Sequence, residues 1–263
     1  MNTHLGDVAE YHLPVVDILE KTGFTKANDW VGKSLSIKFT GNIHCVVTGK
    51  KIRKTFGEGM SYEAFLSSPL AVESIVRPEL SRIHEGIALR DREWEEEHHN
   101  RPHYVYLSRT SGVKVGVTRT SNVPSRWIDQ GATEAIIVAE TPYRQLAGLM
   151  EVALKAHMAD KTAWQAMLKN EVKDTRPLDT YKSGVLDILG GDSEPFFYES
   201  DQVTVIRYPV LEYPAKVKSL KLDNEPEIWG KLLGIKGQYL IFDGGRVLNV
   251  RSHAGYQVEI SWE

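Results

Sequence analysis

The chain has 263 residues, of which 41% are hydrophobic and 25% are charged. This composition is typical of a globular protein and excludes disordered and collagen-like classes. The 32 Lys and Arg residues against 35 Asp and Glu residues give a formal net charge of -3, so no global positive field draws nucleic acid to the chain. The one cysteine, Cys45, cannot form an intramolecular disulfide, and we therefore expect a cytoplasmic protein. No apolar run reaches membrane-spanning length, so no membrane partner is expected.

The first hundred residues begin with a strand pattern and continue with a charged one. Residues 34–47 alternate polar and apolar side chains on either side of Gly41-Asn42, which predicts a β-hairpin. Residues 82–99 are charged nearly throughout and predict an exposed helix or an irregular wrap. A short basic run, interpreted as a solvated surface, precedes them and consists of Lys50, Lys51, Arg53 and Lys54.

The middle region has the most regular pattern. Residues 104–108 and 113–117 both alternate, and Thr110-Ser111-Gly112 between them has turn chemistry, so we predict a second β-hairpin. One face of this hairpin is apolar. The opposite face carries Tyr104, Tyr106, Lys114, Gly116 and Thr118.

Two helices and a strand should follow the hairpin. Asn122 and Gly131 bracket a short helix that carries Arg126. A strand is expected at 135–139, and Thr141-Pro142 then opens a helix that carries Glu151. This order places an arginine and a glutamate on consecutive helices beside the hairpin.

The last third of the chain predicts further β-structure. Thr162 and Gln165 form a capping box for one short helix, after which five strands are expected. Asp243-Gly244-Gly245 supplies a hairpin turn between two of them, and we predict a small antiparallel barrel or sandwich. The expected strands are 203–208, 217–222, 237–242, 246–250 and 257–262.

These elements predict an α+β fold in three parts. Residues 1–100 form a β-rich segment, residues 101–172 form the hairpin, helix, strand and helix module, and residues 173–263 form a second β-rich segment. No linker composition marks the joins between them.

The module resembles the GIY-YIG endonuclease superfamily. Tyr104-Val105-Tyr106 stands where that superfamily has its first tripeptide, and Lys114-Val115-Gly116 stands where it has the second. Thr118, Arg126 and Glu151 match its later positions. The whole chain is similar to an uncharacterised bacterial family, domain of unknown function 2797, in the segments HYVYLSRTSGVKVGVTR, RWIDQGA, RYPVLEYPAKVKSL and LLGIKGQYLIF.

The resemblance to the nuclease superfamily implies metal-dependent cleavage of a phosphodiester in DNA or RNA. Glu151 would hold one Mg²⁺ or Mn²⁺, Arg126 would bind the scissile phosphate, and Tyr106 would position or deprotonate water. Further phosphate contacts are assigned to Lys114, Thr118 and Arg119. Two positions depart from the superfamily pattern, because Lys114 replaces a tyrosine and the usual histidine after Arg126 is absent, with Asp129 and Gln130 in its neighbourhood.

Purely structural roles are also possible for the same residues. Glu151 lies four residues before Lys155, a spacing that allows a plain helical ion pair. Arg126 is able to pair with Asp129, and Tyr106 is able to serve as a half-buried strand aromatic. The alternative function is therefore a non-catalytic module that binds nucleic acid or another protein.

The family resemblance also implies a zinc-ribbon-like region whose ligands this chain has lost. Relatives in domain of unknown function 2797 carry paired cysteines in the N-terminal half. Most matching positions here hold residues without a thiolate, so we expect that structural zinc is lost and that the ribbon is degenerate. These positions are Cys45, Thr48, Ser61, Ala64, Ser74 and Ser81.

Overall fold

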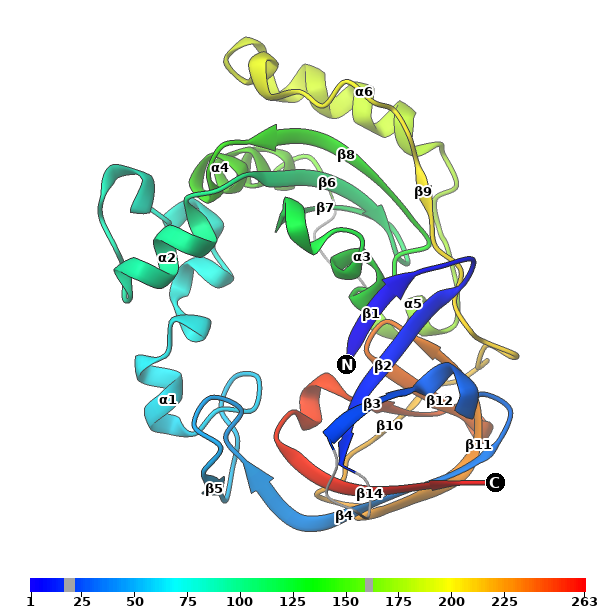
Figure 1. Ribbon diagram of the computed structural model, residues 1–263. Coiled ribbons are helices and arrows are strands. Elements are labelled where there is room, and N and C mark those ends of the chain that lie inside the picture. Colours follow the sequence, from blue (N-terminus) through cyan, green and yellow to red (C-terminus); the bar gives the residue numbers. More distant parts are fainter. Residues whose placement is uncertain (17–21, 159–162) are drawn as a thin grey trace.

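The structure is a computed structural model that describes residues 1–16, 22–158 and 163–263. It contains both helices and sheets, which confirms the α+β class. The strands form a central sheet, a larger barrel-like sheet and a small N-terminal sheet (Figure 1). Within these described ranges, no helix is both long enough and apolar enough to cross a membrane.

The central sheet contains the predicted hairpin. Strands β6 (His103–Arg109) and β7 (Val113–Arg119) pair antiparallel, and Tyr106 lies opposite Gly116. Strand β8 (Glu134–Thr141) joins the other side of β6, and the short β9 (Thr204–Val205) joins β8. The order β7-β6-β8-β9 leaves β7 at an edge of the sheet.

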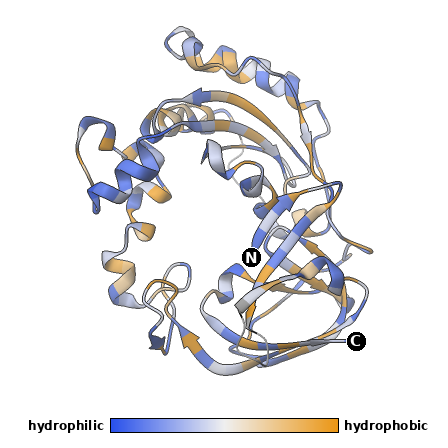
Figure 2. Ribbon diagram, viewed as in Figure 1, coloured by the Kyte–Doolittle hydropathy of each residue, from blue (hydrophilic) through white to orange (hydrophobic). Residues whose placement is uncertain are grey.

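The two faces of the central sheet are covered by different helices. Helices α4 (Arg144–Lys155) and α6 (Leu178–Leu189) pack on the apolar face, where Val105 and Leu107 meet Met150 and Leu154 in one core cluster. Helix α3 (Ser125–Asp129) lies on the opposite face, and the rings of Tyr106 and Trp127 are 5.9 Å apart there. Figure 2 shows the hydrophobic segments along β6, β8 and α6.

Both predicted helices of the module exist, but they begin later than expected. Pro124, and not Asn122, is the residue before α3, because Asn122 ends the short 3-10 helix η6 (Thr120–Asn122). Tyr143 precedes α4, while the Thr141 hydroxyl donates to the His103 carbonyl oxygen. Thr162 lies outside the described residues, and the short helix α5 spans Trp164–Leu168.

The barrel-like sheet combines strands from both ends of the chain. Its order is β10-β13-β12-β11-β4-β14, with β5 (Lys51–Ile52) paired to β4. It therefore joins the two segments that were predicted to flank the central module. All pairs are antiparallel except β10 with β13, so the expectation of a purely antiparallel sheet was wrong in that pair. The strands are β4 (Ser34–His44), β10 (Lys218–Leu220), β11 (Glu227–Lys236), β12 (Tyr239–Phe242), β13 (Arg246–Asn249) and β14 (Tyr256–Trp262).

The hairpin predicted at 34–47 was wrong. Strand β4 continues through Gly41-Asn42, and the register with β14 shifts there, because Phe39 faces Val258 while Ile43 faces Tyr256. Gly41 has a φ of +82°. A bulge and a turn both use a glycine with positive φ. Gly41, which predicted a turn, therefore marks a bulge in β4.

The N-terminal sheet consists of β1 (Asn2–Leu5), β2 (Ala9–Val16) and β3 (Thr22–Lys26). It docks on α3 through β1. The Thr3 hydroxyl donates to Asp129 at 3.1 Å, and the Ser125 hydroxyl donates to the Thr3 carbonyl oxygen at 2.9 Å. The N-terminal sheet thus holds α3 from the side opposite the central sheet.

The segment between β5 and β6 runs along one side of the molecule in Figure 1 and carries little regular structure. It contains α1 (Tyr62–Ser67), α2 (Arg92–His99) and four 3-10 turns: η2 (Pro69–Ala71), η3 (Glu73–Ile75), η4 (Pro78–Leu80) and η5 (Ile83–Glu85). The predicted charged helix is present as α2, but Glu95 and His99 in it are buried. Glu95 accepts the backbone N–H groups of Leu89, Arg90 and Asp91, which explains its burial.

Helix α4 is held against this segment at a glycine. A Cβ built on Gly148 would lie 2.6 Å from the Pro78 carbonyl carbon in η4, so only glycine fits. We expect Gly148→Ala to lower the free energy of unfolding by about 1–3 kcal/mol because backbone must move. Gly184→Ala in α6 is the matched control, since nothing lies within 4 Å of its Cβ, and it should be neutral or stabilising by up to about 1 kcal/mol. Urea unfolding of both variants tests this, and equal effects would contradict the close packing.

Candidate functional site

The site begins with the contact between Tyr106 and Gly116. A Cβ built on Gly116 would lie 2.6 Å from the Tyr106 hydroxyl oxygen and 2.7 Å from Cζ of the same ring. The phenol therefore crosses β7 at the one residue that leaves room for it. Because β7 is an edge strand, the Tyr106 hydroxyl reaches the border of the central sheet.

Three other side chains act on the Tyr106 hydroxyl. It donates a hydrogen bond to Gln130 Oε1 at 3.1 Å. Burial raises the pKa of Tyr106, Arg126 opposes this through its charge and a side-chain hydrogen bond, and Glu151 raises the pKa further. Of the set predicted from the sequence, Arg126 on α3 and Glu151 on α4 thus both act electrostatically on Tyr106 on β6. The Tyr106 side chain is fully buried, so the hydroxyl stays protonated at neutral pH.

Glu151 is nearly buried on α4 and is already neutralised. Its side chain is 10% exposed, and Lys155 Nζ lies 3.4 Å from Glu151 Oε1. The i,i+4 ion pair considered above is therefore present beside the electrostatic contact with Tyr106. Arg144, seven residues before Glu151 and two helical turns away, also interacts with the Glu151 charge.

Positive charge is concentrated in four side chains, of which Arg144 interacts with the Glu151 charge. Burial, together with the charges of Arg126 and Arg119, outweighs the opposing charge of Glu151 and lowers the pKa of Arg144 to about 10. Burial also lowers the pKa of Arg119, to which the charge of Arg101 contributes. Cations that repel one another in a partly buried place attract an anion. We call Arg101, Arg119, Arg126 and Arg144 the arginine cluster.

Arg144 is fixed in place by backbone oxygens. Its Nε donates to the Ser74 carbonyl oxygen at 2.9 Å, and its Nη2 donates to the Ile75 carbonyl oxygen at 3.0 Å. Neither acceptor carries a full charge. The guanidinium therefore keeps its positive charge available to Glu151 and to the rest of the arginine cluster.

The predicted phosphate-binding residues do not all reach the arginine cluster. Arg119 belongs to it, while Thr118 is buried opposite Tyr104. Lys114 pairs with Ser108 and lies on the other side of Gly116 from Arg119 along β7. Five residues of strand correspond to about 17 Å between the Lys114 and Arg119 backbones.

Arg144 and Arg101 were not predicted from the sequence, and Gln130 was noted only near the position of the missing histidine, with no role. Arg144 had a detectable signal, because a residue seven positions before Glu151 on a helix lies on the same side. Arg101 and Gln130 lie in connecting segments, and only the tertiary structure places them here.

No group of three or more His, Cys, Asp or Glu side chains is arranged to hold a metal in the part of the chain that the structure describes. Around Cys45, the Ser61 N–H donates to Sγ at 3.2 Å. Burial raises the pKa of the Cys45 thiol, but the Thr48 side chain and the N–H groups of Ser61, Thr48 and Val47 outweigh it and lower the pKa to about 6. Ala64 packs in the same small cluster as Cys45.

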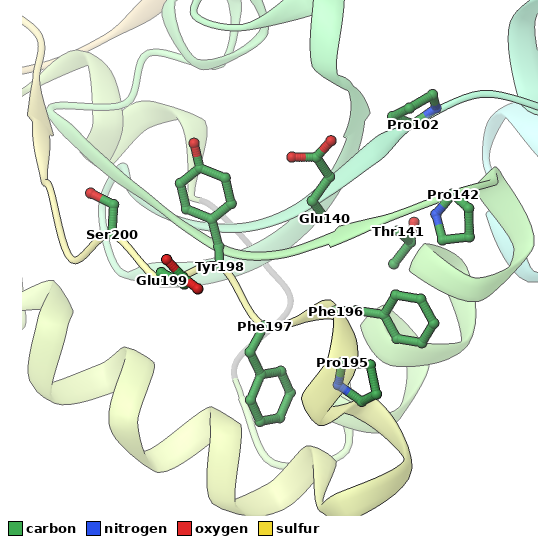
Figure 3. Close-up of a pocket in the computed structure, with 10 residues that line it drawn as sticks. All are labelled: Pro102, Glu140, Thr141, Pro142, Pro195, Phe196, Phe197, Tyr198, Glu199 and Ser200. Carbon is green, nitrogen blue, oxygen red and sulfur yellow. The ribbon is translucent and has the colours of Figure 1, made fainter.

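Two hollows adjoin the module formed by residues 101–172. The larger, of about 1420 Å³, lies between α3, the N-terminal sheet and the barrel-like sheet, and Arg126 and Asp129 line it. The smaller, of about 530 Å³, lies beside the end of β8 and is lined by Glu140 and Tyr198 among others. In Figure 3, Phe197 points toward α6 whereas Tyr198 and Glu140 lie on the other side. Tyr106, Arg126 and Glu151 do not line this smaller hollow.

The chain belongs to the family described as "Protein of unknown function (DUF2797)", whose profile matches residues 32–258. The match includes most of the barrel-like sheet and the whole central sheet. No curated protein and no solved structure matches the chain. The function is therefore inferred from the site itself.

Two buried histidines beside the arginine cluster make stability depend on pH. Burial, together with the charges of Arg144 and Arg119, lowers the pKa of His99 and of His103 to about 3. His103 Nδ1 lies 2.7 Å from the Arg101 carbonyl oxygen, which assigns the proton of the neutral ring to Nδ1. Its Nε2 has no hydrogen-bond partner among the residues described.

The folded state therefore prefers the neutral form of His103. Its contribution to stability is complete above the unfolded pKa of 6.5 and is lost as the pH falls toward about 3. Between pH 7 and pH 5, we expect the wild-type protein to lose about 1–2 kcal/mol more unfolding free energy than the His103→Asn variant loses. Urea unfolding at both pH values measures this. His157→Asn, on an exposed residue, should keep the wild-type pH dependence, and an unchanged slope in His103→Asn would contradict the assignment.

Proposed function

We propose that the protein binds the phosphodiester backbone of DNA or RNA at the arginine cluster and hydrolyses it with a divalent cation on Glu151. The observation that supports this proposal is that Arg126 and Glu151, from two different helices, both act on the buried Tyr106 hydroxyl. A phosphate between the cations and the metal would have its growing negative charge neutralised from both sides.

Glu151 fits one Mg²⁺ or Mn²⁺ with an incomplete protein shell. Mg²⁺ commonly binds through one or two carboxylates and takes its other ligands from water and phosphate oxygens. A nearly buried carboxylate with cationic neighbours is consistent with such a site once Lys155 moves from its position 3.4 Å away. The cation, when bound, would polarise the phosphate and acidify water.

The chain's own residues would bind and orient the substrate. Arg126 would hold phosphate oxygens through its planar guanidinium, and Arg119 would hold a neighbouring phosphate. Tyr106 has a raised pKa, so it would serve as a hydrogen-bond donor and would not deprotonate water. The resemblance implied that the tyrosine would either position or deprotonate water, and only the positioning role is kept here.

The resemblance to the GIY-YIG endonuclease superfamily supports the proposal in part. The elements follow the expected order from β6 to α4, and Tyr106 faces Gly116. At the position of the missing histidine, Gln130 accepts from Tyr106 while Asp129 accepts from Thr3. The Gln130 amide cannot act as a general base, and Asp129 Oδ1 already accepts the Thr3 hydroxyl.

A second candidate function is binding without cleavage. Two observations favour it: Lys155 neutralises Glu151, and the Tyr106 hydroxyl is buried and paired with Gln130. A module of this kind would bind nucleic acid through the arginine cluster alone. Its affinity would then fall steeply with salt and would not require a divalent cation.

Cleavage of end-labelled oligonucleotides with and without Mg²⁺ tests the proposal. We expect Glu151→Gln and Arg126→Ala each to lower the cleavage rate by about 100-fold or more, because each removes charge that stabilises the transition state. Glu171→Gln and Arg82→Ala are the matched controls, since both residues form exposed ion pairs elsewhere, and they should cleave at the wild-type rate. Cleavage that survives both site substitutions would falsify the catalytic assignment.

Binding measured at several salt concentrations separates the two candidates. Arg119→Ala should weaken binding to all sequences and reduce the slope of log affinity against log salt by about one, because one phosphate contact is lost. Retained binding without Mg²⁺-dependent cleavage would favour the non-catalytic module. Binding that ignores salt would contradict both candidates.

A further inference from the structure

The larger hollow opens directly beside the proposed phosphate site. We call this space of about 1420 Å³ the barrel cavity. It lies between α3, the N-terminal sheet and the barrel-like sheet, and Arg126 forms part of its wall. Arg126 also acts on the Tyr106 hydroxyl. A strand held by one phosphate at Arg126 would thus be able to place another of its nucleotides along the wall of the barrel cavity.

Aromatic rings form two pairs on the wall of the barrel cavity. The rings of Trp30 and Trp262 are 5.4 Å apart, and those of His253 and Tyr256 are 5.1 Å apart. Aliphatic residues from the barrel-like sheet supply much of the remaining wall, including Leu240. Such a surface accepts a flat, uncharged ring by stacking and by burial of apolar area.

The charges on the wall favour a base over a phosphate inside the barrel cavity. The wall carries the carboxylates of Glu58, Asp129 and Glu259, and Arg251 is paired with Glu58. These carboxylates would repel a phosphate from their part of the wall, whereas Arg126 on the same wall belongs to the arginine cluster. Gln238 offers an amide with both donors and acceptors, the groups that read the edge of an unpaired base.

We propose that the barrel cavity receives an unpaired base of the strand whose phosphate is held at Arg126, so that the substrate is single-stranded nucleic acid. This inference rests on the proposed function. A base in a duplex is stacked and paired, and reaching the cavity would cost its unstacking energy. A single strand presents its bases freely, and it therefore gains the stacking contacts without that cost.

Two probes separate binding of bases from binding of phosphates. One is a labelled strand of twelve thymidylates, and the other is a strand of twelve abasic units with the same phosphates and no bases. Fluorescence anisotropy in EDTA measures both affinities without cleavage. We expect the thymidylate strand to bind about tenfold more tightly, because one stacked base accounts for at least this factor.

Substitution of Trp262 identifies the barrel cavity as the source of that preference. Trp262 is 45% exposed on β14, and Trp229, 66% exposed on β11, does not line the cavity. Trp262→Ala should remove most of the tenfold preference, Trp262→Phe should keep most of it, and the control Trp229→Ala should leave it unchanged. Thermal unfolding confirms that each variant is folded. Arg126→Ala should weaken the binding of both strands alike.

The possible failures are distinguishable. Equal affinity for the thymidylate and abasic strands, or a preference that Trp262→Ala leaves intact, would overturn base binding in the barrel cavity while the phosphate site stands. Tighter binding of a twelve-base-pair duplex than of the single strand would overturn it as well. Absence of binding by either strand would overturn the nucleic-acid proposal together with this inference.

Discussion

The packing of Tyr106 across Gly116 is the constraint on which the site depends. Any side chain at position 116 would collide with the phenol, so the pairing of these two residues in β6 and β7 determines where the hydroxyl lies. The hydroxyl is thereby held near the edge of the central sheet. Helix α3, held by the N-terminal sheet, brings Arg126 to this hydroxyl from one face, and α4 brings Glu151 from the other. The site is thus made by three elements that meet around an edge strand.

The balance of charge around that edge determines what the site is able to bind. The net charge of the chain is -3, but the arginine cluster contains four guanidinium groups that act on one another, and one of them, Arg144, also interacts with the nearly buried Glu151. The field that matters to a phosphate is therefore local. The barrel cavity has a different character, with aromatic rings and carboxylates on its wall. This difference between the two surfaces is what the proposal requires, because a phosphate and a base differ in the same way.

Local patterns in the sequence predicted the central module well, because its contacts are short-range. Alternation over β6 and β7 correctly placed Tyr106 and Gly116 on one face of the hairpin, and the helices that carry Arg126 and Glu151 were both identified. The barrel-like sheet was predicted less well because it depends on distant pairings. Strand β4 pairs with β11 and β14 from the other end of the chain, and no local signal distinguishes the bulge at Gly41 from a turn. Arg101 was not predicted for the same reason, because only the tertiary structure brings its charge within reach of Arg119.

Binding of Mn²⁺ followed by NMR tests most directly whether Glu151, Arg126 and Tyr106 form one metal and phosphate site. Paramagnetic Mn²⁺ broadens nearby signals, and the indole N–H of Trp127 reports on the site because its ring is 5.9 Å from that of Tyr106. The account predicts that Mn²⁺ broadens the Trp127 signal before that of Trp229, and that Glu151→Gln abolishes this selectivity. Equal broadening of both indoles, or selective broadening that persists in Glu151→Gln, would contradict it.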